Sequence, residues 1–277
     1  MKIDHVSVGG RDLKRLEEPF KQAGMETVYG GPHSGGETHM SLLGFSDGSY
    51  IELISTIKEG ERASLWNRQI AGDGGPCAWA IEVEDIAREV SKARELGIPA
   101  SGPVDYSRKR PDGVSVEWEL GFLGGGEPGA VLPFLIRDKT PRENRVRPSP
   151  SVSGGPLRGV SAVVIGVKWP DDHVRSLRGM YGWHEPEVDR GLWEGVELAS
   201  FGDAPAVLAS PTGPGWLSDR LERFGDCPCA FLIEATDLKA AAELYPVEGP
   251  RHWFGGETLR WVAPLKRAGM MIGLVGR

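Results

Sequence analysis

The segment CAWAIEVEDI at residues 77–86 recurs in the second half of the chain as CAFLIEATDL at residues 229–238. The two copies share Cys, Ala, Ile, Glu and Asp at the same places, and an aromatic residue stands third in each. An apolar run followed by Asp predicts a strand that leads into a helix, with Asp85 or Asp237 as the N-cap. The repeat, with similar flanking segments, indicates that the two halves are duplicates.

Each half divides again into two units with the order strand, helix, strand, strand, strand, so the chain reads as four βαβββ units. They begin at Ile3, Ala78, Val160 and Cys229. In the second unit, the stretch between the helix ending at Leu96 and the strand starting at Val114 predicts a Pro/Gly-rich connection. The segment TPRENRVRPSPSVSGGP at 140–156 is typical of a linker. We therefore expect domains at 1–139 and 158–277, joined by a linker at 140–157.

Composition narrows the class of protein. The chain has 277 residues, a net charge of −7 and 40% hydrophobic residues, with 39 Gly and 21 Pro spread along it. The acidic balance argues against nucleic-acid and anionic-lipid partners, and no apolar run is long enough to span a membrane. The start of the chain shows no signal peptide and the three cysteines are too few for a disulfide framework, which favours a cytoplasmic protein with free thiols. The sequence leaves a homodimer open.

Several short motifs resemble one known family. They are Ile3-Asp-His-Val, Gly30-Gly-Pro-His33 followed by Gly36-Glu-Thr-His39, Tyr50-Ile-Glu-Leu-Ile54, Arg108-Lys-Arg-Pro-Asp-Gly113 and Glu117-Trp118. Together they resemble glyoxalase-like proteins of the vicinal oxygen chelate (glyoxalase/bleomycin resistance/dioxygenase) superfamily. The resemblance is strong over residues 1–137 and rests on the repeat plan alone over 158–277. It implies an α+β fold in which four βαβββ modules pair into two curved mixed sheets, or half-barrels, with helices on the outside.

His5 and Glu52 are the candidate catalytic or metal-binding pair. Each is a polar residue on one face of an otherwise apolar strand. The resemblance implies that the first and last strands of a module lie side by side, so that these two side chains converge. Imidazole and carboxylate are ligand types for Fe, Mn, Zn or Ni. The alternative is that His5 satisfies a buried polar group by hydrogen bonding, and that no metal binds.

The resemblance also implies ligands on the first and last strands of the second module, and these are missing. The segments 77–81 and 131–136 carry no His, Asp or Glu at their centres, and Cys77 is at best a weak ligand. In the second half, Ala162 stands at the position of His5 and the strand 206–209 has no carboxylate. The metal set is therefore incomplete, and the sequence leaves open whether one divalent metal or none binds.

Five further residues are candidates for substrate binding. Asp47-Gly48 predicts a two-residue hairpin that places Leu43 opposite Glu52, and His39 on the face of Glu52, about 13 Å along the strand at ~3.3 Å per residue. We expect His39 either at the rim of the cleft or half-exposed, and His33 in a glycine-rich loop nearby. Arg108 and Arg110 either receive a carboxylate or phosphate or stand in a solvated turn. Trp118 belongs to the core or to the cleft wall.

Two functions follow from these residues. The first is a lyase, isomerase or related enzyme of the superfamily acting on a small oxygenated metabolite, in which Glu52 is base or ligand and His5 is ligand or polariser. Burial is expected to raise the pKa of Glu52 in that case. The second is a non-catalytic protein that binds and sequesters a small molecule, with Trp79 and Trp118 in the cleft. For residues 158–277, a purely structural role also stays open.

Overall fold

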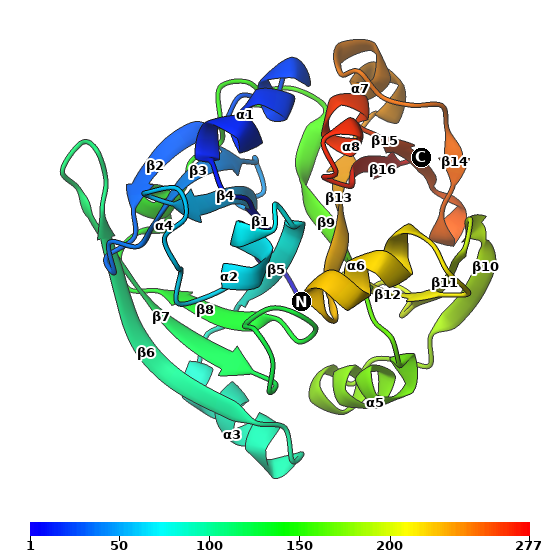
Figure 1. Ribbon diagram of the computed structural model, residues 1–277, viewed down its shortest axis with the longest axis horizontal. Coiled ribbons are helices and arrows are strands. Elements are labelled where there is room, and N and C mark those ends of the chain that lie inside the picture. Colours follow the sequence, from blue (N-terminus) through cyan, green and yellow to red (C-terminus); the bar gives the residue numbers. More distant parts are fainter.

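Two eight-stranded mixed sheets form the body of the protein (Figure 1). The computed structural model describes all residues from 1 to 277. The first sheet has the order β2-β3-β4-β1-β5-β8-β7-β6, and the second repeats it as β10-β11-β12-β9-β13-β16-β15-β14. The predicted α+β fold of paired βαβββ modules is confirmed.

The strands of the first sheet are β1 (Ile3–Gly9), β2 (Val28–Pro32), β3 (Thr38–Gly44), β4 (Tyr50–Thr56), β5 (Gly75–Glu82), β6 (Ala100–Lys109), β7 (Ser115–Leu123) and β8 (Phe134–Asp138). Those of the second are β9 (Leu157–Gly166), β10 (Glu187–Trp193), β11 (Val196–Ser200), β12 (Ala206–Pro211), β13 (Cys227–Ala235), β14 (Arg251–His252), β15 (Thr258–Trp261) and β16 (Ile272–Gly276). The helices are α1 (Leu13–Gln22), α2 (Asn67–Ala71), α3 (Ile86–Glu95), α4 (Arg142–Arg145), α5 (Pro170–Tyr181), α6 (Trp216–Phe224), α7 (Leu238–Leu244) and α8 (Ala263–Arg267), with a short 3₁₀ turn at Phe254–Gly256. None of the helices combines the length and the apolar character needed to cross a membrane.

Within each module the first strand lies parallel to the last, and the two first strands join the modules. In the first sheet β1 pairs with β4 in parallel and with β5 in the antiparallel sense. The register sets His5 opposite Tyr50, and Ser7 opposite Glu52. Because side chains alternate along a strand, His5, Ser7 and Glu52 share one face of the sheet, as their period-2 spacing predicts.

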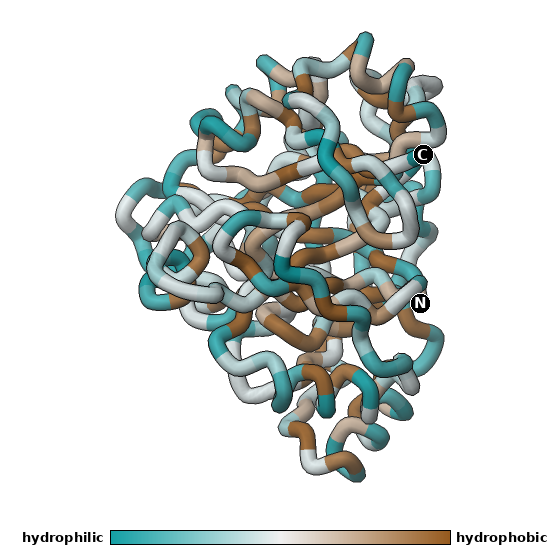
Figure 2. The backbone as a smooth tube through the Cα atoms, turned by 90° about the vertical axis from the view of Figure 1, so that its right-hand side faces the viewer, coloured by the Kyte–Doolittle hydropathy of each residue, from teal (hydrophilic) through white to brown (hydrophobic).

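The helices begin where the sequence predicts a cap. The side chain of Asp85 accepts a hydrogen bond from the Arg88 amide at 3.0 Å, and Asp237 does the same for Ala240 at 2.9 Å. Such caps satisfy amides that the first helical turn leaves unpaired. The apolar sides of α1, α3, α5, α7 and α8 join one core of 43 buried residues, which runs through both halves of the chain. Figure 2 shows hydrophobic stretches of the backbone concentrated in the middle of the molecule and hydrophilic ones toward its rim.

Each sheet has one face on the shared core, and the faces that point away from this core differ between the two sheets. In the second sheet that face is filled by a cluster of its own, to which α6 contributes Leu217 and Leu221, and which includes Trp253 and Trp261. In the first sheet the same face carries a smaller apolar cluster and several polar groups. The first sheet is therefore the one that keeps space for a ligand.

Two local predictions are wrong. The stretch expected as a Pro/Gly-rich connection contains β6, a ten-residue strand at the sheet edge. Pro103 is tolerated there because it lies between Ser101 and Val104, where the pairing register shifts. The β3–β4 hairpin is also one residue out of the expected register, since Leu42, not Leu43, lies opposite Glu52. Its loop has three residues instead of two, and Gly48 takes φ +86° in it.

The segment 140–157, expected as a linker, packs against the first sheet. It forms α4, and Arg145 and Ser149 in it are buried. Ser149 donates to the carbonyl of Leu42 at 3.4 Å and accepts from the amide of Gly44 at 3.0 Å. The domain boundaries themselves stay a prediction, because the two halves share one core.

The two edges of the first sheet, β2 and β6, come together. Gly31 has φ +101°, and a Cβ at that position would lie 3.2 Å from the carbonyl oxygen of Lys109. The guanidinium of Arg108 donates across this seam to the carbonyl of Gly30 and, at 2.7 Å, to that of Arg145. The two edges are not paired as strands, but this contact brings the curved first sheet close to closure around its inner face.

Candidate functional site

A cavity of about 260 Å³ lies inside the curved first sheet, and we call it the first-sheet cavity. Residues of β1, β4, β6, β7 and β8 line it, together with the loops 33–38 and 64–66. Its polar side includes His5, His33 and Glu52, while aromatic and aliphatic side chains form most of the remaining wall. A few convergent polar groups in an apolar cavity are typical of a small-molecule site.

Glu52 is a buried carboxylate with two polar neighbours. The Ser7 hydroxyl donates to its Oε2 at 3.1 Å, and Nε2 of His33 lies 3.4 Å from its Oε1. Burial by itself raises the pKa of Glu52, but the contact and charge of His33, the charge of His5 and the Ser7 hydroxyl outweigh it and lower the pKa to about 2. The expectation of a raised pKa was therefore wrong, because it took account of burial and not of these partners.

Three neighbouring side chains hold the ring of His5 in place. Its ring stacks on Tyr50 with centroids 4.6 Å apart and packs edge-to-face with Phe134, whose ring centroid is 5.2 Å away. Nδ1 lies 2.6 Å from Oδ1 of Asp4, the preceding residue, where an irregularity in the β1–β5 register turns the two side chains toward each other. This bond leaves Nε2 as the ring nitrogen available to a ligand, since His5 lines the first-sheet cavity.

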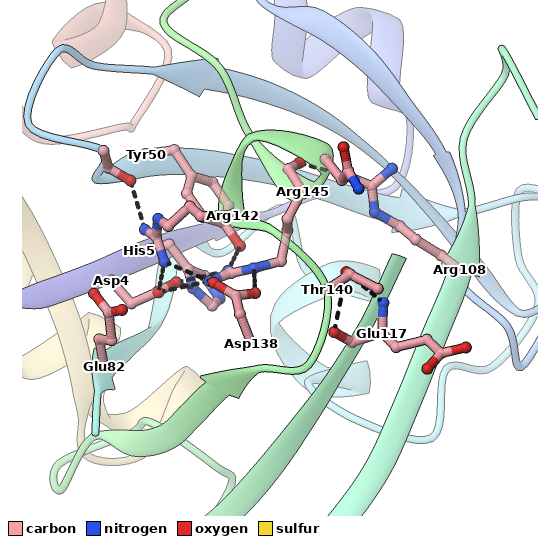
Figure 3. A network of polar contacts seen from close by, with 12 residues as sticks. Asp4, His5, Tyr50, Glu82, Arg108, Glu117, Asp138, Thr140, Arg142 and Arg145 are labelled. Atoms are coloured by element: carbon pink, nitrogen blue, oxygen red, sulfur yellow. Dashed lines mark hydrogen bonds and ion pairs between the residues drawn. The ribbon is translucent and has the colours of Figure 1, made fainter. Parts of the chain in front are cut away.

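Asp4 in turn belongs to a buried charge network (Figure 3). Arg145 donates to both carboxylate oxygens of Asp4 at 2.8 Å, and also to Asp138 and to the hydroxyl of Tyr50. Arg142 forms a further ion pair with Asp4. Burial would raise the pKa of Asp4, but Arg145 and His5 together hold it well below its usual value. Asp4 is therefore a permanent anion behind His5.

The donor set does not fit a complete metal centre. No group of three or more His, Cys, Asp or Glu side chains in the chain is arranged to hold a metal ion. From the second module, β8 presents Phe134 and Ile136 to the cavity. Cys77 is fully buried and its thiol lies 3.3 Å from the carbonyl of Ser7. His5, His33 and Glu52 face the cavity but are not arranged as a set of metal ligands, so we derive no step through a metal.

The structure brings His33 and Trp118 together with His5 and Glu52. Nδ1 of His33 lies 2.8 Å from the hydroxyl of Thr38, which orients the ring toward Glu52. Trp118 lines the cavity and stacks on Tyr106 at 6.4 Å. Both positions are consistent with contacts to a small molecule.

The remaining candidates lie outside the cavity. The one-residue shift of the β3–β4 hairpin turns His39 to the other face, where its ring meets Tyr29 at 5.9 Å. Arg108 is 5% exposed and its guanidinium donates to backbone carbonyls at the seam, so it does not stand in a solvated turn. Arg110 pairs with Asp112 at 2.7 Å and donates to the carbonyl of Asn144.

Two residues of the site have weak signals in the sequence. Asp4 is a charge within an apolar strand, and that position could have pointed to a buried ion pair. Trp66 lies in a loop, where it adopts φ 54°, with its amide held by Glu127 and its indole NH donating to the carbonyl of Pro128. Its ring lines the cavity. Trp79, expected in the cleft, is instead fully buried in the shared core.

Comparison with known proteins supports the fold. A family model described as a glyoxalase-like domain matches residues 3–180. None of the curated protein sequences matches the chain. Among solved structures, a hypothetical protein from Staphylococcus aureus is 13% identical with a TM-score of 0.62, and the match covers 98% of each chain.

Two solved enzymes are similar over 99% of this chain. A mutant of 4-hydroxymandelate synthase from Streptomyces coelicolor is 11% identical, with a TM-score of 0.63 and 92% of its own chain covered. The Mn(II)-bound glyoxalase from Novosphingobium aromaticivorans is 13% identical, with a TM-score of 0.56 and 81% of its chain covered. At these identities the likeness concerns the fold, and it extends over both halves of the chain.

Proposed function

The chain belongs to the glyoxalase-like domain family of the vicinal oxygen chelate superfamily, and we propose that its first-sheet cavity is the active site of an enzyme acting on a small oxygenated metabolite. The reaction class is proton transfer at a carbon next to a carbonyl, as in an isomerase or lyase. The observation that carries the proposal is the Asp4–His5 pair at 2.6 Å, which faces a cavity that also holds the ionised Glu52.

His5 is the proton acceptor in this proposal. The C–H bond next to the carbonyl breaks, the proton moves to Nε2, and the electron pair delocalises onto the carbonyl oxygen. The anionic Asp4 fixes the ring through Nδ1 and stabilises the imidazolium that forms, as a carboxylate does behind a general-base histidine. Return of the proton to a different atom or face completes an isomerisation.

Glu52 has a different role, because a pKa of about 2 keeps it ionised and makes it a weak base. Its carboxylate accepts a hydrogen bond from a substrate hydroxyl and sets the substrate's orientation. His33 and Ser7 hold that carboxylate in place at 3.4 Å and 3.1 Å. The buried rings of Phe134 and Trp118 limit the access of water to the reacting carbon.

Exchange of hydrogen for deuterium tests the proposal. The protein is incubated in D₂O with a panel of α-hydroxy ketones, aldehydes and 2-oxo acids, and loss of the proton next to the carbonyl is followed by NMR. We expect exchange with at least one compound, lowered about a hundredfold or more in His5→Gln and Glu52→Gln. The control His39→Gln makes the same chemical change outside the cavity and retains exchange. Undiminished exchange in His5→Gln contradicts the assignment.

The largely apolar wall of the cavity favours one alternative, a protein that binds a small molecule without transforming it. In that case panel compounds shift the NMR signals of cavity residues, and no compound exchanges its protons. The same experiment therefore separates the two functions.

A further inference from the structure

We infer that the first-sheet cavity takes a single-ring aromatic molecule whose head group is a neutral or cationic hydrogen-bond donor, and that it rejects carboxylates and phosphates. The inference names the ligand class of the site proposed above, so it rests on that site being the binding site. It concerns recognition, and it holds for an enzyme or for a binding protein.

Aromatic side chains dominate the wall. Five line the cavity: Trp66, Tyr106, Trp118, Phe122 and Phe134. They form two groups: the Tyr106 ring stacks on Trp118 with centroids 6.4 Å apart and meets Phe122 edge-on at 6.5 Å, and the Trp66 ring lies 6.0 Å from that of Phe134. Such a wall binds another ring by offset or edge-to-face packing, and ring faces also attract cations.

The charges in the cavity are those of acids and histidines. Glu52 and Glu37 line it, and no Lys or Arg does. Glu37 accepts hydrogen bonds from the amide and hydroxyl of Ser64 at 2.8 and 2.7 Å, which lower its pKa and keep it ionised. An anionic head group would meet these carboxylates with no guanidinium or ammonium to receive it, while His5 pairs with Asp4 and His33 with Glu52.

Two buried arginines beside the first sheet already have partners. Arg145 donates to Asp4 and Asp138, and Arg108 donates to the carbonyls of Gly30 and Arg145. Neither is among the residues that line the cavity. A buried guanidinium that is fully occupied by partners of its own cannot recruit a carboxylate without losing them.

The volume of the cavity suits a ligand of one ring. The cavity measures about 260 Å³, and an apolar protein cavity of about 150 Å³ holds benzene. The space beyond a ring accommodates a side chain of two or three atoms. The head of that side chain then faces Glu52, which can only accept hydrogen bonds while it is ionised.

Three ligands of matched shape test the inference: 2-phenylethanol, 2-phenylethylamine and phenylacetate. Their affinities for the full chain are measured by NMR titration at pH 7. We expect the alcohol or the amine, or both, to bind at least about tenfold more tightly than phenylacetate. Equal or tighter binding of phenylacetate overturns the inference, and so does the absence of binding by all three at millimolar concentration.

Variants connect the preference to named groups. Glu52→Gln removes the negative charge of the acceptor and is expected to reduce the difference in affinity between the amine and phenylacetate. Trp118→Leu is expected to weaken the binding of all three ligands by a similar factor, about fivefold, because it removes ring packing and no charge. His39→Gln, outside the cavity, leaves all three affinities unchanged.

The binding experiment and the proton-exchange experiment can fail independently of each other. Selective binding without proton exchange by any compound leaves the ligand class standing and contradicts the proposed reaction. Proton exchange that is confined to 2-oxo acids and depends on His5 supports the proposed reaction and contradicts the ligand class.

Discussion

Asp4 and His5 are neighbours in the chain, and their side chains meet at 2.6 Å, between Oδ1 and Nδ1. Consecutive residues of a regular strand point to opposite faces, so this contact depends on the register irregularity near the start of β1. Arg145, from the segment after the first sheet, holds the far side of Asp4. Arg145, 140 positions away in the sequence, is therefore connected to His5 through Asp4.

Removing the charge of Asp4 is expected to destabilise the fold strongly. Asp4→Asn removes one of the two carboxylates that pair with the buried Arg145, and such a loss costs about 3–5 kcal/mol. Urea unfolding measures the change. The control Asp105→Asn breaks an exposed ion pair with Lys139 and is expected to change little. Similar small effects in both variants would contradict a structural role for the network.

A conservative substitution at Arg145 tests what orients His5 while Asp4 stays in place. Arg145→Lys keeps a positive charge but cannot reproduce the donors that reach Asp4, Asp138 and Tyr50 together. We expect the nitrogen chemical shifts of His5 to move, reporting a changed tautomer or hydrogen bond at Nδ1. Unchanged His5 signals in a folded variant would show that Asp4 alone orients the ring.

Acid is expected to remove the stabilisation that the ionised Glu52 provides. Its pKa is lowered from 4.5 to about 2 in the folded chain. A carboxyl with a depressed pKa stabilises the fold above its unfolded pKa, and this contribution is lost as the pH falls from about 4.5 through 2. The total is on the order of 3 kcal/mol.

Unfolding free energies measured between pH 7 and pH 3 check this expectation. Glu52→Gln cannot titrate, so its stability should fall less steeply with acid than that of the natural chain. Parallel slopes for the two proteins would mean that Glu52 has an ordinary pKa. Glu84→Gln is a suitable control, because it makes the same chemical change at an exposed carboxylate that does not line the cavity.

Opening the seam between β2 and β6 is expected to loosen the cavity. Arg108→Met leaves the carbonyls of Gly30 and Arg145 without their donor, at a cost of about 2–3 kcal/mol. Hydrogen exchange should then increase at the amides of β2 and β6 more than at those of β9 and β13. Lys109→Met, at the neighbouring exposed position, serves as control. Uniform exchange across both sheets would argue against a closing role for Arg108.

Tight binding of a divalent metal is not expected from the donor set. After incubation with Mn, Fe, Ni or Zn and dialysis, elemental analysis should find less than one equivalent per chain, because only a partial ligand set faces the cavity. One retained equivalent that His5→Ala abolishes would contradict this and make His5 a ligand.

The sequence alone determined the repeating plan of the fold. Period-2 runs, the Asp caps and the duplicated CAWAIEVEDI segment are local features, and local features define strands, helix starts and the order of modules. They also place His5 and Glu52 on a common face. The loss of ligand types from the second module is likewise visible in the residues themselves.

Only the tertiary structure decided which polar groups meet. The one-residue difference in the length of the hairpin loop moved His39 out of the site. Arg108 and Arg145 look like surface charges in sequence, yet both are buried, because distant backbone carbonyls and carboxylates come within reach of them. The pKa of Glu52 depends on the sum of desolvation and three partners from β1 and the loop after β2, and no local pattern encodes such a sum. Long-range approach of the chain creates both the cavity and its charge balance.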